Sequence, residues 1–424
     1  MSDQVSRRAF VTSAAIGAPA LLNAQNSGNR LKAAWIGTGS RGNHVMNMAY
    51  GGSAELMEVV AVCDTYAGNL ARAKDNVQSK GKNTPKTYVD FKELLADPNV
   101  EVVFICTPEH LHHEMAMAAI KAKKHIYLEK PIAHTLEEGA EIVKASEAAG
   151  IKLQVGTQNR SNSLYIQAKK MVEDGMIGDI HYVRAFWYRN SLDDNPAWRY
   201  KIPDDASPEN TDWKRFLGTE PYVDKKRPFD KQRYYQWRLY WDYSGGISTD
   251  LLVHQTDITN FVCGKTEPLS CAASGGIYRW VSDDREVPDT LSALYEYPNR
   301  FHINYSCYFG NDWFGYGEQF MGNEGTIEVL NRQILNFNPE KFGGKPPEKV
   351  AARKPINMHL PGNDVPAVQS HVRNLFESIL GKAQLIAPAK AGQQAAVGGH
   401  LATLSYRNGK KVLWDEKTQK HKFA

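Results

Sequence analysis

Apolar runs alternate with longer amphipathic stretches through the first third of the chain. The runs at 31–36, 58–64, 100–108 and 125–128 are rich in Val, Ile and Ala and end at turn-forming or charged residues, which is typical of buried strands. The stretches between them, such as 43–50, have the spacing of helices. This alternation from residue 31 to about 150 predicts an α/β domain with a right-handed, doubly wound parallel sheet.

The pattern changes after residue 155. We expect a helix over 163–174, a strand over 180–188, and further strands where apolar and polar residues alternate, at 292–297, 301–308 and 325–329. Residues 338–366 are rich in Pro, Gly and Lys and are predicted to be a long surface loop. Helices over 368–380 and 389–408 are expected to return to the core. The expected division is a signal and linker at 1–30, a dinucleotide-binding domain at 31–155 and a second domain at 156–424.

The first strand runs directly into a glycine-rich loop, Gly37-Thr38-Gly39-Ser40-Arg41-Gly42. A strand, a GxGxxG loop and a helix in this order are typical of a pyrophosphate site. Gly37 permits a tight turn, Gly39 lets the backbone approach an anion at the helix N-terminus, and Gly42 permits close packing. The sequence therefore predicts a nicotinamide dinucleotide as cofactor.

Three later strands also end in polar motifs. Asp64 ends the second strand and is placed to bind an adenosine ribose; because a carboxylate disfavours a 2′-phosphate, NAD is preferred over NADP. Thr107-Pro108 ends the next strand, and Glu129-Lys130-Pro131 follows the strand at 125–128. The carboxyl ends of parallel strands are where open α/β sheets place their chemistry.

A second cluster lies at 245–258, where a Gly-Gly turn precedes a helix that Ser248 or Thr249 is expected to cap. Asp250, His254 and Asp257 follow at i, i+4 and i+7, so we expect them on one helical face. An ion pair on a solvated face is the alternative for such a motif. A metal site is not predicted, because these three residues have no evident fourth ligand.

The order of GxGxxG, Val-Cys-Asp, Thr-Pro-x-x-x-His, Glu-Lys-Pro and GG…D-x-x-x-H-x-x-D resembles the Gfo/Idh/MocA family, named for glucose-fructose oxidoreductase and inositol dehydrogenase. The resemblance implies a Rossmann domain, a second α/β domain on a large, open, mainly antiparallel sheet, and a homo-oligomer. It implies catalysis by Lys130, Asp250 and His254. The expected cofactor-binding residues are Gly37, Gly39, Ser40, Arg41, Gly42, Asp64, Thr107, Pro108, Glu109, His112, Glu129, Lys130 and Gln158.

Oxidation of an alcohol requires hydride transfer to the nicotinamide and removal of the hydroxyl proton. His254 is a natural base, since an imidazole has an ordinary pKa of about 6.5. Asp250 can orient that imidazole, and Lys130 can polarise the oxygen or share the proton. The sequence does not decide which of the two takes the proton.

Aromatic and basic residues at 186–189, 198–200 and 233–243 are candidates for the walls of a carbohydrate site, although sheet core or an oligomer interface also explains most of them. We expect the substrate-binding residues to be Arg160, Tyr188, Trp237, Arg238 and Asp257. The predicted activity is NAD(P)-dependent oxidation of a sugar, a sugar derivative or a cyclitol. A glycoside hydrolase that oxidises its sugar transiently, with a tightly bound NAD, is the first alternative, and a noncatalytic sugar- or cofactor-binding protein is the second.

The composition of the chain limits the classes of protein to which it can belong. The chain has 424 residues, 42% hydrophobic and 23% charged, with a net charge of +4, so two globular domains are expected and the dispersed charges predict no nucleic-acid partner. Five cysteines without a CxxC pair indicate neither a disulfide framework nor a zinc site. Arg7-Arg8 and the uncharged run 12–22 are typical of a twin-arginine signal, with cleavage near Ala20 or Ala24, and predict export to the periplasm. That run is too short for a stable membrane anchor; a tail that merely contains two arginines is the alternative.

Overall fold

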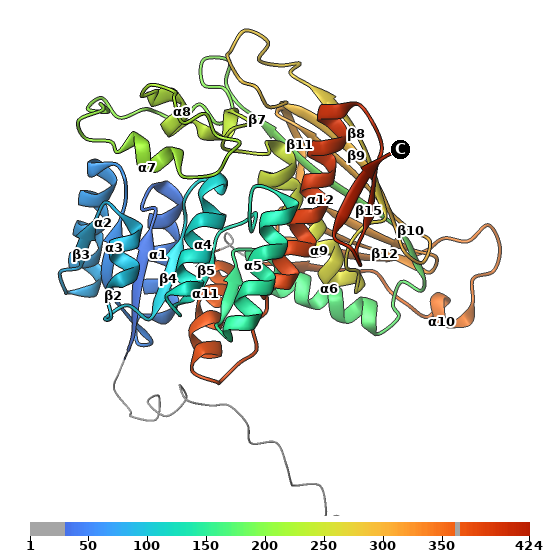
Figure 1. Cartoon of the computed structure of the whole chain (residues 1–424). Helices are drawn as coiled ribbons and strands as arrows, with labels where there is room; N and C mark the ends of the chain where they lie inside the picture. Colours follow the sequence, from blue (N-terminus) through green and yellow to red (C-terminus); the bar gives the residue numbers. More distant parts are fainter. Residues whose placement is uncertain (1–29, 361–364) are drawn as a thin grey trace, which may run out of the picture.

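The computed structural model describes residues 30–360 and 365–424. Two sheets organise this part of the chain, one of six strands and one of ten. Figure 1 shows the first sheet and its helices on the left and the larger sheet on the right. The α/β fold class expected from the sequence, with a parallel sheet followed by a large and mainly antiparallel one, is confirmed.

The first sheet has the order β3-β2-β1-β4-β5-β6, and every neighbouring pair is parallel. Its strands are β1 (Leu31–Ile36), β2 (Met57–Cys63), β3 (Lys86–Tyr88), β4 (Val102–Ile105), β5 (His125–Leu128) and β6 (Leu153–Val155). Its helices and helical turns are α1 (Ser40–Ser53), α2 (Ala67–Gly81), α3 (Phe91–Ala96), η1 (Glu109–Leu111), α4 (His112–Lys121) and α5 (Leu136–Ala149).

The register of this sheet brings the sequence motifs to one edge. Ile36 pairs with both Cys63 and Ile105, and Ile105 pairs with Leu128. The strands therefore end in one row, and the residues that follow them, from the glycine loop to Glu129, line the same edge. This is the edge at which doubly wound sheets bind ligands.

The second sheet has the order β14-β13-β12-β11-β7-β10-β9-β8-β15-β16, in which only β7 and β10 are parallel neighbours. Its strands are β7 (Ile180–Asn190), β8 (Ser270–Gly276), β9 (Thr290–Tyr297), β10 (Phe301–Tyr308), β11 (Gly310–Gly322), β12 (Gly325–Leu330), β13 (Ile334–Pro339), β14 (Ile356–His359), β15 (Val412–Asp415) and β16 (Lys420–Phe423).

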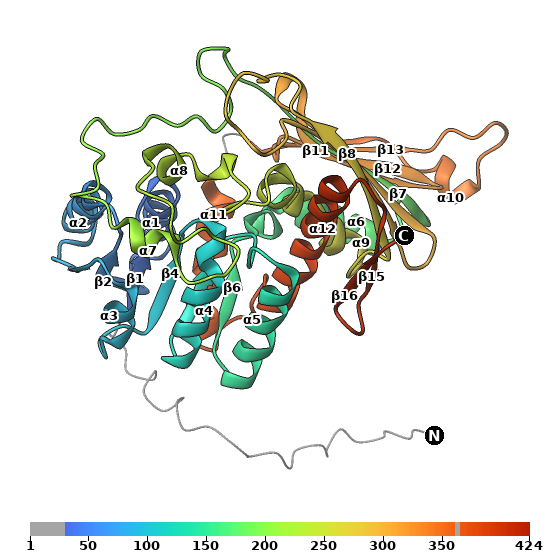
Figure 2. The same cartoon turned by 45° about the horizontal axis from the view of Figure 1, so that its top comes forward.

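Helices pack on the face of this sheet that is turned toward the first domain (Figure 2). They are η2 (Gln158–Ser161), α6 (Ser163–Glu173), the π-helical turn η4 (Ser248–Leu252), α9 (Val253–Cys263) and α12 (Ala389–Asn408). Side chains on the opposite face, such as Arg184 and Leu294, are exposed.

The carboxy-terminal helices fasten the two domains together. Helix α11 (Val365–Ile379) packs on α1, and Phe376 contributes to the core of the first sheet with its ring 5.8 Å from that of Phe104. In α12, the carbonyl of Gly398 accepts a hydrogen bond from Tyr295 of the second sheet, and Gln393 donates one to the carbonyl of Leu136 in the first domain.

Residues 191–243, the crossing segment, leave the second sheet and lie over the first domain, with α7 (Trp213–Leu217), α8 (Lys231–Tyr235) and η3 (Trp237–Leu239) within them. Figure 1 shows α7 and α8 above the helices α1 and α2 of the first domain. Asp212 N donates to the carbonyl of Thr65 at 2.7 Å, and Ala67 N donates to the carbonyl of Asn210 at 2.9 Å. The crossing segment is therefore hydrogen-bonded to the turn that follows β2.

One local expectation was wrong, and one predicted helix is longer than expected. The predicted loop over 338–366 contains α10 (Glu348–Ala351) and β14, because Ile356 to His359 pair with β13 at the sheet edge. The first helix begins at Ser40 rather than at 43, so Ser40 and Arg41 belong to its first turn. The predicted export signal lies outside the described residues. Within the described ranges, no helix combines the length and the apolar character needed to cross a membrane.

Candidate active site

The glycine-rich loop forms the tight turn that the sequence predicts. Gly37 has a φ of +82°, a conformation that favours glycine, and a Cβ on Gly42 would lie 2.0 Å from the carbonyl oxygen of Gly37. Gly39 is the N-cap of α1 and has no side-chain hydrogen bond at that cap. A Cβ on Gly39 would meet nothing closer than 3.6 Å. The loop leaves space above a helix N-terminus, and this cradle fits a dinucleotide pyrophosphate.

Asp64 follows β2 and is held by its surroundings. Its Oδ2 accepts a hydrogen bond from Thr38 N at 2.7 Å, and its Oδ1 accepts one from Tyr66 N at 2.9 Å. Only 7% of the residue is exposed, and burial raises its pKa above the ordinary value despite these hydrogen bonds. Asp64 therefore braces the glycine loop, and the crossing segment contributes Tyr234, whose hydroxyl lies 3.5 Å from Asp64 Oδ1.

Arg41 of the glycine loop reaches across the sheet edge to the Glu-Lys-Pro motif. Its Nη2 lies 2.8 Å from Glu129 Oε1, which also accepts a hydrogen bond from Gln158 at 3.1 Å. Burial would raise the pKa of Glu129, but the charge and hydrogen bond of Arg41, together with the charge of Lys130, outweigh burial and lower that pKa. Glu129 therefore remains ionised and fixes the start of the segment that carries Lys130.

Lys130 meets Asp250 of the second domain. Lys130 Nζ lies 3.0 Å from Asp250 Oδ1 and also donates to the Asp250 carbonyl, while Arg238 Nε donates to the same Oδ1 at 3.1 Å. Burial would raise the pKa of Asp250, but the charges of Lys130 and Arg238 outweigh it and lower that pKa far below its usual value. One ionised carboxylate thus positions two cations.

Asp250 lies in the π-helical turn η4 rather than at the start of a regular α-helix. Glu109 of the first domain holds this turn: its carboxylate accepts hydrogen bonds from Gly245 N and from the hydroxyl of Thr249, the latter at 3.0 Å to Oε2. The expectation that Ser248 or Thr249 caps the helix was wrong, since Ser248 donates back to the Gly245 carbonyl and Thr249 donates to Glu109.

His254 lies in the next turn, and its ring centroid is 5.8 Å from that of Trp187 on β7. Its Nδ1 is buried and has no hydrogen-bond partner among the described residues. Burial and then the charges of Lys130 and Arg332 lower its pKa well below the ordinary value. The imidazole is therefore unprotonated near neutral pH, which leaves a ring nitrogen with a free lone pair close to the charge of Lys130.

Two predicted cofactor-binding residues are buried and already bonded to protein groups. Besides its contacts with the η4 turn, Glu109 lies 2.9 Å from His134 Nδ1. His112 is 1% exposed and bridges the carbonyls of Pro131 and Thr107 at 2.7 and 3.0 Å. The structure corrects these two assignments to positioning roles, because both side chains are buried and their polar atoms are bonded to protein groups. Thr107 and Pro108 are half-buried at that edge.

Two predicted substrate-binding residues, Asp257 and Tyr188, are also placed elsewhere. Asp257 is fully buried and pairs with Arg160 Nε at 2.8 Å, and burial raises the pKa of Asp257 to about 6. Asp257 therefore has no surface to offer a substrate, whereas Arg160 is partly exposed and stays a predicted substrate-binding residue. Tyr188 lies on the opposite face of the sheet from His254, where its hydroxyl lies 2.6 Å from Ser306 Oγ, because successive strand residues alternate between faces.

The alternation places Trp187 and Arg189 of β7 on the face of His254 instead. The Trp187 ring stacks on that of Tyr316 at 4.5 Å, and the guanidinium of Arg189 lies 4.9 Å from the Trp187 centroid. The sequence analysis included Trp187 and Arg189 in an aromatic and basic segment, but it selected Tyr188 from that segment as the substrate-binding residue. Counting every second residue along the strand from a position known to be buried would have placed Trp187 and Arg189 on the inner face.

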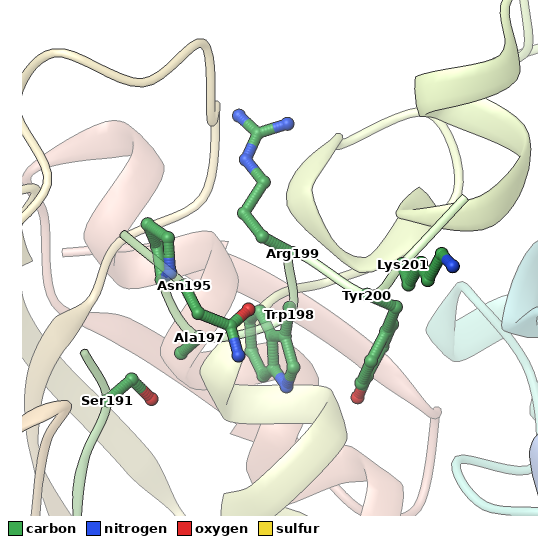
Figure 3. Close-up of a pocket in the computed structure, with 8 residues that line it drawn as sticks. Ser191, Asn195, Ala197, Trp198, Arg199, Tyr200 and Lys201 are labelled. Atoms are coloured by element: carbon green, nitrogen blue, oxygen red, sulfur yellow. The ribbon is translucent and has the colours of Figure 1, made fainter. Parts of the chain in front are cut away.

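Trp237 and Arg238 lie in η3 next to Asp250, with the Arg238 guanidinium 4.3 Å from the Trp237 centroid and 5.9 Å from that of Tyr200. Tyr200 lines a surface pocket of about 550 Å³. In Figure 3, Trp198 and Tyr200 point to one side of this pocket and Arg199 to the other. Neither Lys130 nor Asp250 lines this pocket, and Tyr200 connects it to the site through its contact with Arg238.

Among the described residues, Asp250, His254 and Asp257 do not converge as metal ligands. The group whose ligand atoms come within 4.8 Å of one another is instead His113, Glu138 and Glu220. It lies apart from Lys130, and its members bond to protein groups: His113 lies 2.9 Å from Glu220, and Glu138 accepts from Tyr222 at 2.9 Å.

Comparison with known families agrees with this geometry. The profile described as "Oxidoreductase family, NAD-binding Rossmann fold" matches residues 31–157, and the one described as "Oxidoreductase family, C-terminal alpha/beta domain" matches residues 221–413. The chain belongs to the Gfo/Idh/MocA family. The first match contains the glycine loop and Lys130, and the second contains Asp250 and His254.

Curated members of the Gfo/Idh/MocA family are similar to parts of the chain. The uncharacterized oxidoreductase YrbE of Bacillus subtilis is 27% identical over 232 residues, 54% of this chain and 52% of YrbE. The inositol 2-dehydrogenase of Salmonella typhimurium is 34% identical over 175 residues, 41% of this chain and 49% of that enzyme. The chain thus matches about half the length of these relatives.

Solved structures share the fold over most of the chain. Levoglucosan dehydrogenase in complex with NADH and levoglucosan has a TM-score of 0.70 at 19% identity, covering 91% of this chain and 99% of its own. Aldose-aldose oxidoreductase from Caulobacter crescentus has a TM-score of 0.64 at 20% identity, covering 91% and 100%.

Proposed function

We propose that the protein is an NAD-dependent oxidoreductase that oxidises a hydroxyl-bearing carbon of a sugar, a sugar derivative or a cyclitol. One observation carries this proposal: Lys130 Nζ and Asp250 Oδ1 lie 3.0 Å apart, with His254 in the next helical turn, at the carboxyl edge of a nucleotide-binding sheet. The names inositol 2-dehydrogenase and levoglucosan dehydrogenase, given to two similar proteins, support a polyhydroxylated substrate.

When bound, the oxidised nicotinamide supplies the acceptor for the hydride that leaves the carbinol carbon. The Lys130 ammonium donates a hydrogen bond to the substrate oxygen and stabilises negative charge there. His254, neutral because its pKa is lowered, takes the hydroxyl proton, so that the hydroxyl becomes a carbonyl. Asp250 remains ionised and keeps Lys130 in place.

We propose that the glycine loop and Arg41 hold the cofactor phosphates and that Asp64 favours NAD over NADP. The crossing segment supports slow cofactor exchange, because it is hydrogen-bonded to the turn around Thr65 and covers Asp64. Release of the adenosine end would require contacts such as the 2.7 Å bond between Asp212 N and the Thr65 carbonyl to open.

Export of the folded protein by the twin-arginine route to the periplasm remains part of the proposal. Slow release of the cofactor is consistent with that route, since a nucleotide bound in the cytoplasm would have to stay bound during and after export. We also propose a homo-oligomer that uses the exposed face of the second sheet, where Leu294 is 46% exposed and the rings of Tyr182 and His302 stack at 5.8 Å.

Redox-assisted glycoside cleavage is the second candidate function. It needs a further base near the oxidised sugar, and Tyr200 favours it because this half-exposed phenol lies beside Arg238. In that reaction oxidation acidifies a neighbouring C–H bond, elimination breaks the glycosidic bond, and the hydride returns to the sugar, so no net oxidation occurs.

The proposal is tested on the full mature protein in two steps. Mass spectrometry of the nucleotide released on denaturation should find NAD, and a panel of sugars, sugar acids and cyclitols should then reduce that cofactor. Consumption of an aryl glycoside without net NADH formation would support the second candidate instead. A protein that neither contains nor binds a nicotinamide nucleotide would overturn both.

A further inference from the structure

Strand β7 presents an exposed cation to the candidate active site. Trp187 and Arg189 lie on the same face of the strand because they are two positions apart. The Trp187 ring centroid is 5.8 Å from that of His254, and the Arg189 guanidinium lies 4.9 Å from the Trp187 centroid. Arg189 is thus one aromatic ring away from the proposed base, at the end of the strand.

Electrostatic effects place Arg189 and Asp250 near the same part of the second sheet. Burial raises the pKa of the Cys307 thiol to about 12. Two nearby charges also act on this pKa: the positive charge of Arg189 lowers it, and the negative charge of Asp250 raises it. The same two charges act with the same signs on the pKa of Tyr305, which burial raises. Both groups therefore lie around the same stretch of β10.

Arg332 also lies over Trp187, with its guanidinium 5.3 Å from the ring centroid. Three other arginines near the site have carboxylate partners. Arg238 pairs with Asp250 at 3.1 Å, Arg41 with Glu129 at 2.8 Å, and Arg160 with Asp257 at 2.8 Å. For Arg189, no ion pair is formed with any carboxylate in the described ranges. Two cations, Lys130 and Arg238, also share the single carboxylate of Asp250. This side of the site thus carries more positive than negative charge.

We infer that Arg189 forms an anion subsite and that the substrate is a sugar carrying a carboxylate or a phosphate ester. The inference rests on the proposed function and names its substrate class. A guanidinium presents a planar fork of donors that matches either anion, and stacking on Trp187 holds that fork in one orientation. A neutral cyclitol would leave Arg189 without a partner.

The experiment compares matched substrates and matched variants of the full mature protein. Steady-state rates are measured with NAD for glucose, glucuronate and glucose 6-phosphate and for the corresponding galactose series. Arg189→Gln should raise KM for the anionic member of a pair about 10- to 100-fold while leaving kcat within a few fold. Arg184→Gln is the control, because Arg184 makes the same type of contact with Phe186 on the opposite face, at 5.4 Å.

Binding of the same sugars to the NADH-loaded protein is followed by calorimetry, which separates the subsite from the chemistry. The subsite is supported if the Arg189→Gln variant binds the anionic sugar more weakly, while its binding of neutral sugars and all binding by the Arg184→Gln protein stay unchanged. This result supports the subsite even if no sugar is oxidised. Absence of oxidation would contradict the proposed function alone. Preference for glucuronate or for glucose 6-phosphate identifies the anion. Equal affinity for neutral and anionic sugars, unchanged in the Arg189→Gln variant, overturns the subsite and leaves the proposed function standing.

Discussion

The amino group of Lys130 lies 3.0 Å from Oδ1 of Asp250, although 120 positions separate the two residues in the sequence. Lys130 follows a strand of the first domain, and Asp250 lies in a π-helical turn of the second. The pair therefore exists only when the two domains are docked, and it forms where both meet the nucleotide edge. Its geometry leads to the predictions below.

Lys130→Met should lower kcat/KM for any oxidised sugar by about 10²- to 10⁴-fold, because the substrate oxygen loses its hydrogen-bond donor. Affinity for NADH, measured by fluorescence titration, should stay within a few fold. Lys170→Met is the control, since the side chain of Lys170 is 64% exposed on helix α6. A Lys130→Met protein with normal turnover would remove Lys130 from the proposed chemistry.

The acid limb of the kcat/KM profile should lie below about pH 6.5. Burial and neighbouring cations lower the pKa of His254, so its imidazole stays neutral and able to take a proton at pH values where an ordinary histidine is charged. Rates measured from pH 4 to 9 check this, and His254→Gln should abolish that limb along with most activity. An acid limb that persists unchanged in the variant would assign it to another group.

Glu109→Gln should destabilise the protein by about 1–3 kcal/mol. The buried carboxylate accepts hydrogen bonds from Gly245 and Thr249 and lies beside His134, whereas the amide that replaces it has only one acceptor oxygen. Denaturant unfolding measures the loss. Glu173→Gln, which removes an exposed i,i+4 pair, should cost less than about 0.5 kcal/mol. Equal effects in the two variants would contradict the positioning role of Glu109.

Tyr188→Phe should leave kcat/KM within about twofold, since Tyr188 lies on the sheet face away from His254 and loses one contact to Ser306. Trp187→Phe should raise KM more strongly, because it changes the ring between His254 and Arg189. Steady-state kinetics on the two variants decide between the faces. The reverse order of effects would mean that the substrate binds on the outer face.

Stability should fall as pH decreases from about 6.5 to about 4, in part through His400. Burial lowers the pKa of His400 to about 4, whereas the unfolded chain binds this proton near pH 6.5. Within that window the unfolded state binds more protons, so protonation costs folding on the order of 1–3 kcal/mol. His400→Gln should show a shallower decline of Tm between pH 7 and pH 4.5 than the parent protein. Parallel declines would show that His400 titrates normally.

The errors of sequence reasoning at the site have identifiable causes. Tyr188 was preferred to Trp187 because the faces of a strand can be ranked only when the buried side is known. Glu109 and His112 follow the nucleotide-binding strand β4, as cofactor ligands do, but the docking of the second domain and the turn after β5 provide their partners. Asp257 has the helical spacing of a site residue, but Arg160 neutralises it in the interior.

The sequence by itself determined the order of strands and helices in the first domain, the glycine turn and the strand-end position of Lys130. These depend on local periodicity and on backbone preferences of neighbouring residues. Only the tertiary structure decided that Lys130 meets Asp250, that Trp187 rather than Tyr188 faces His254, and that the crossing segment covers Asp64. Such contacts depend on strand register and on the docking of the two domains. Both are set by the free energy of the whole folded chain, so they leave no periodic signal in any one segment.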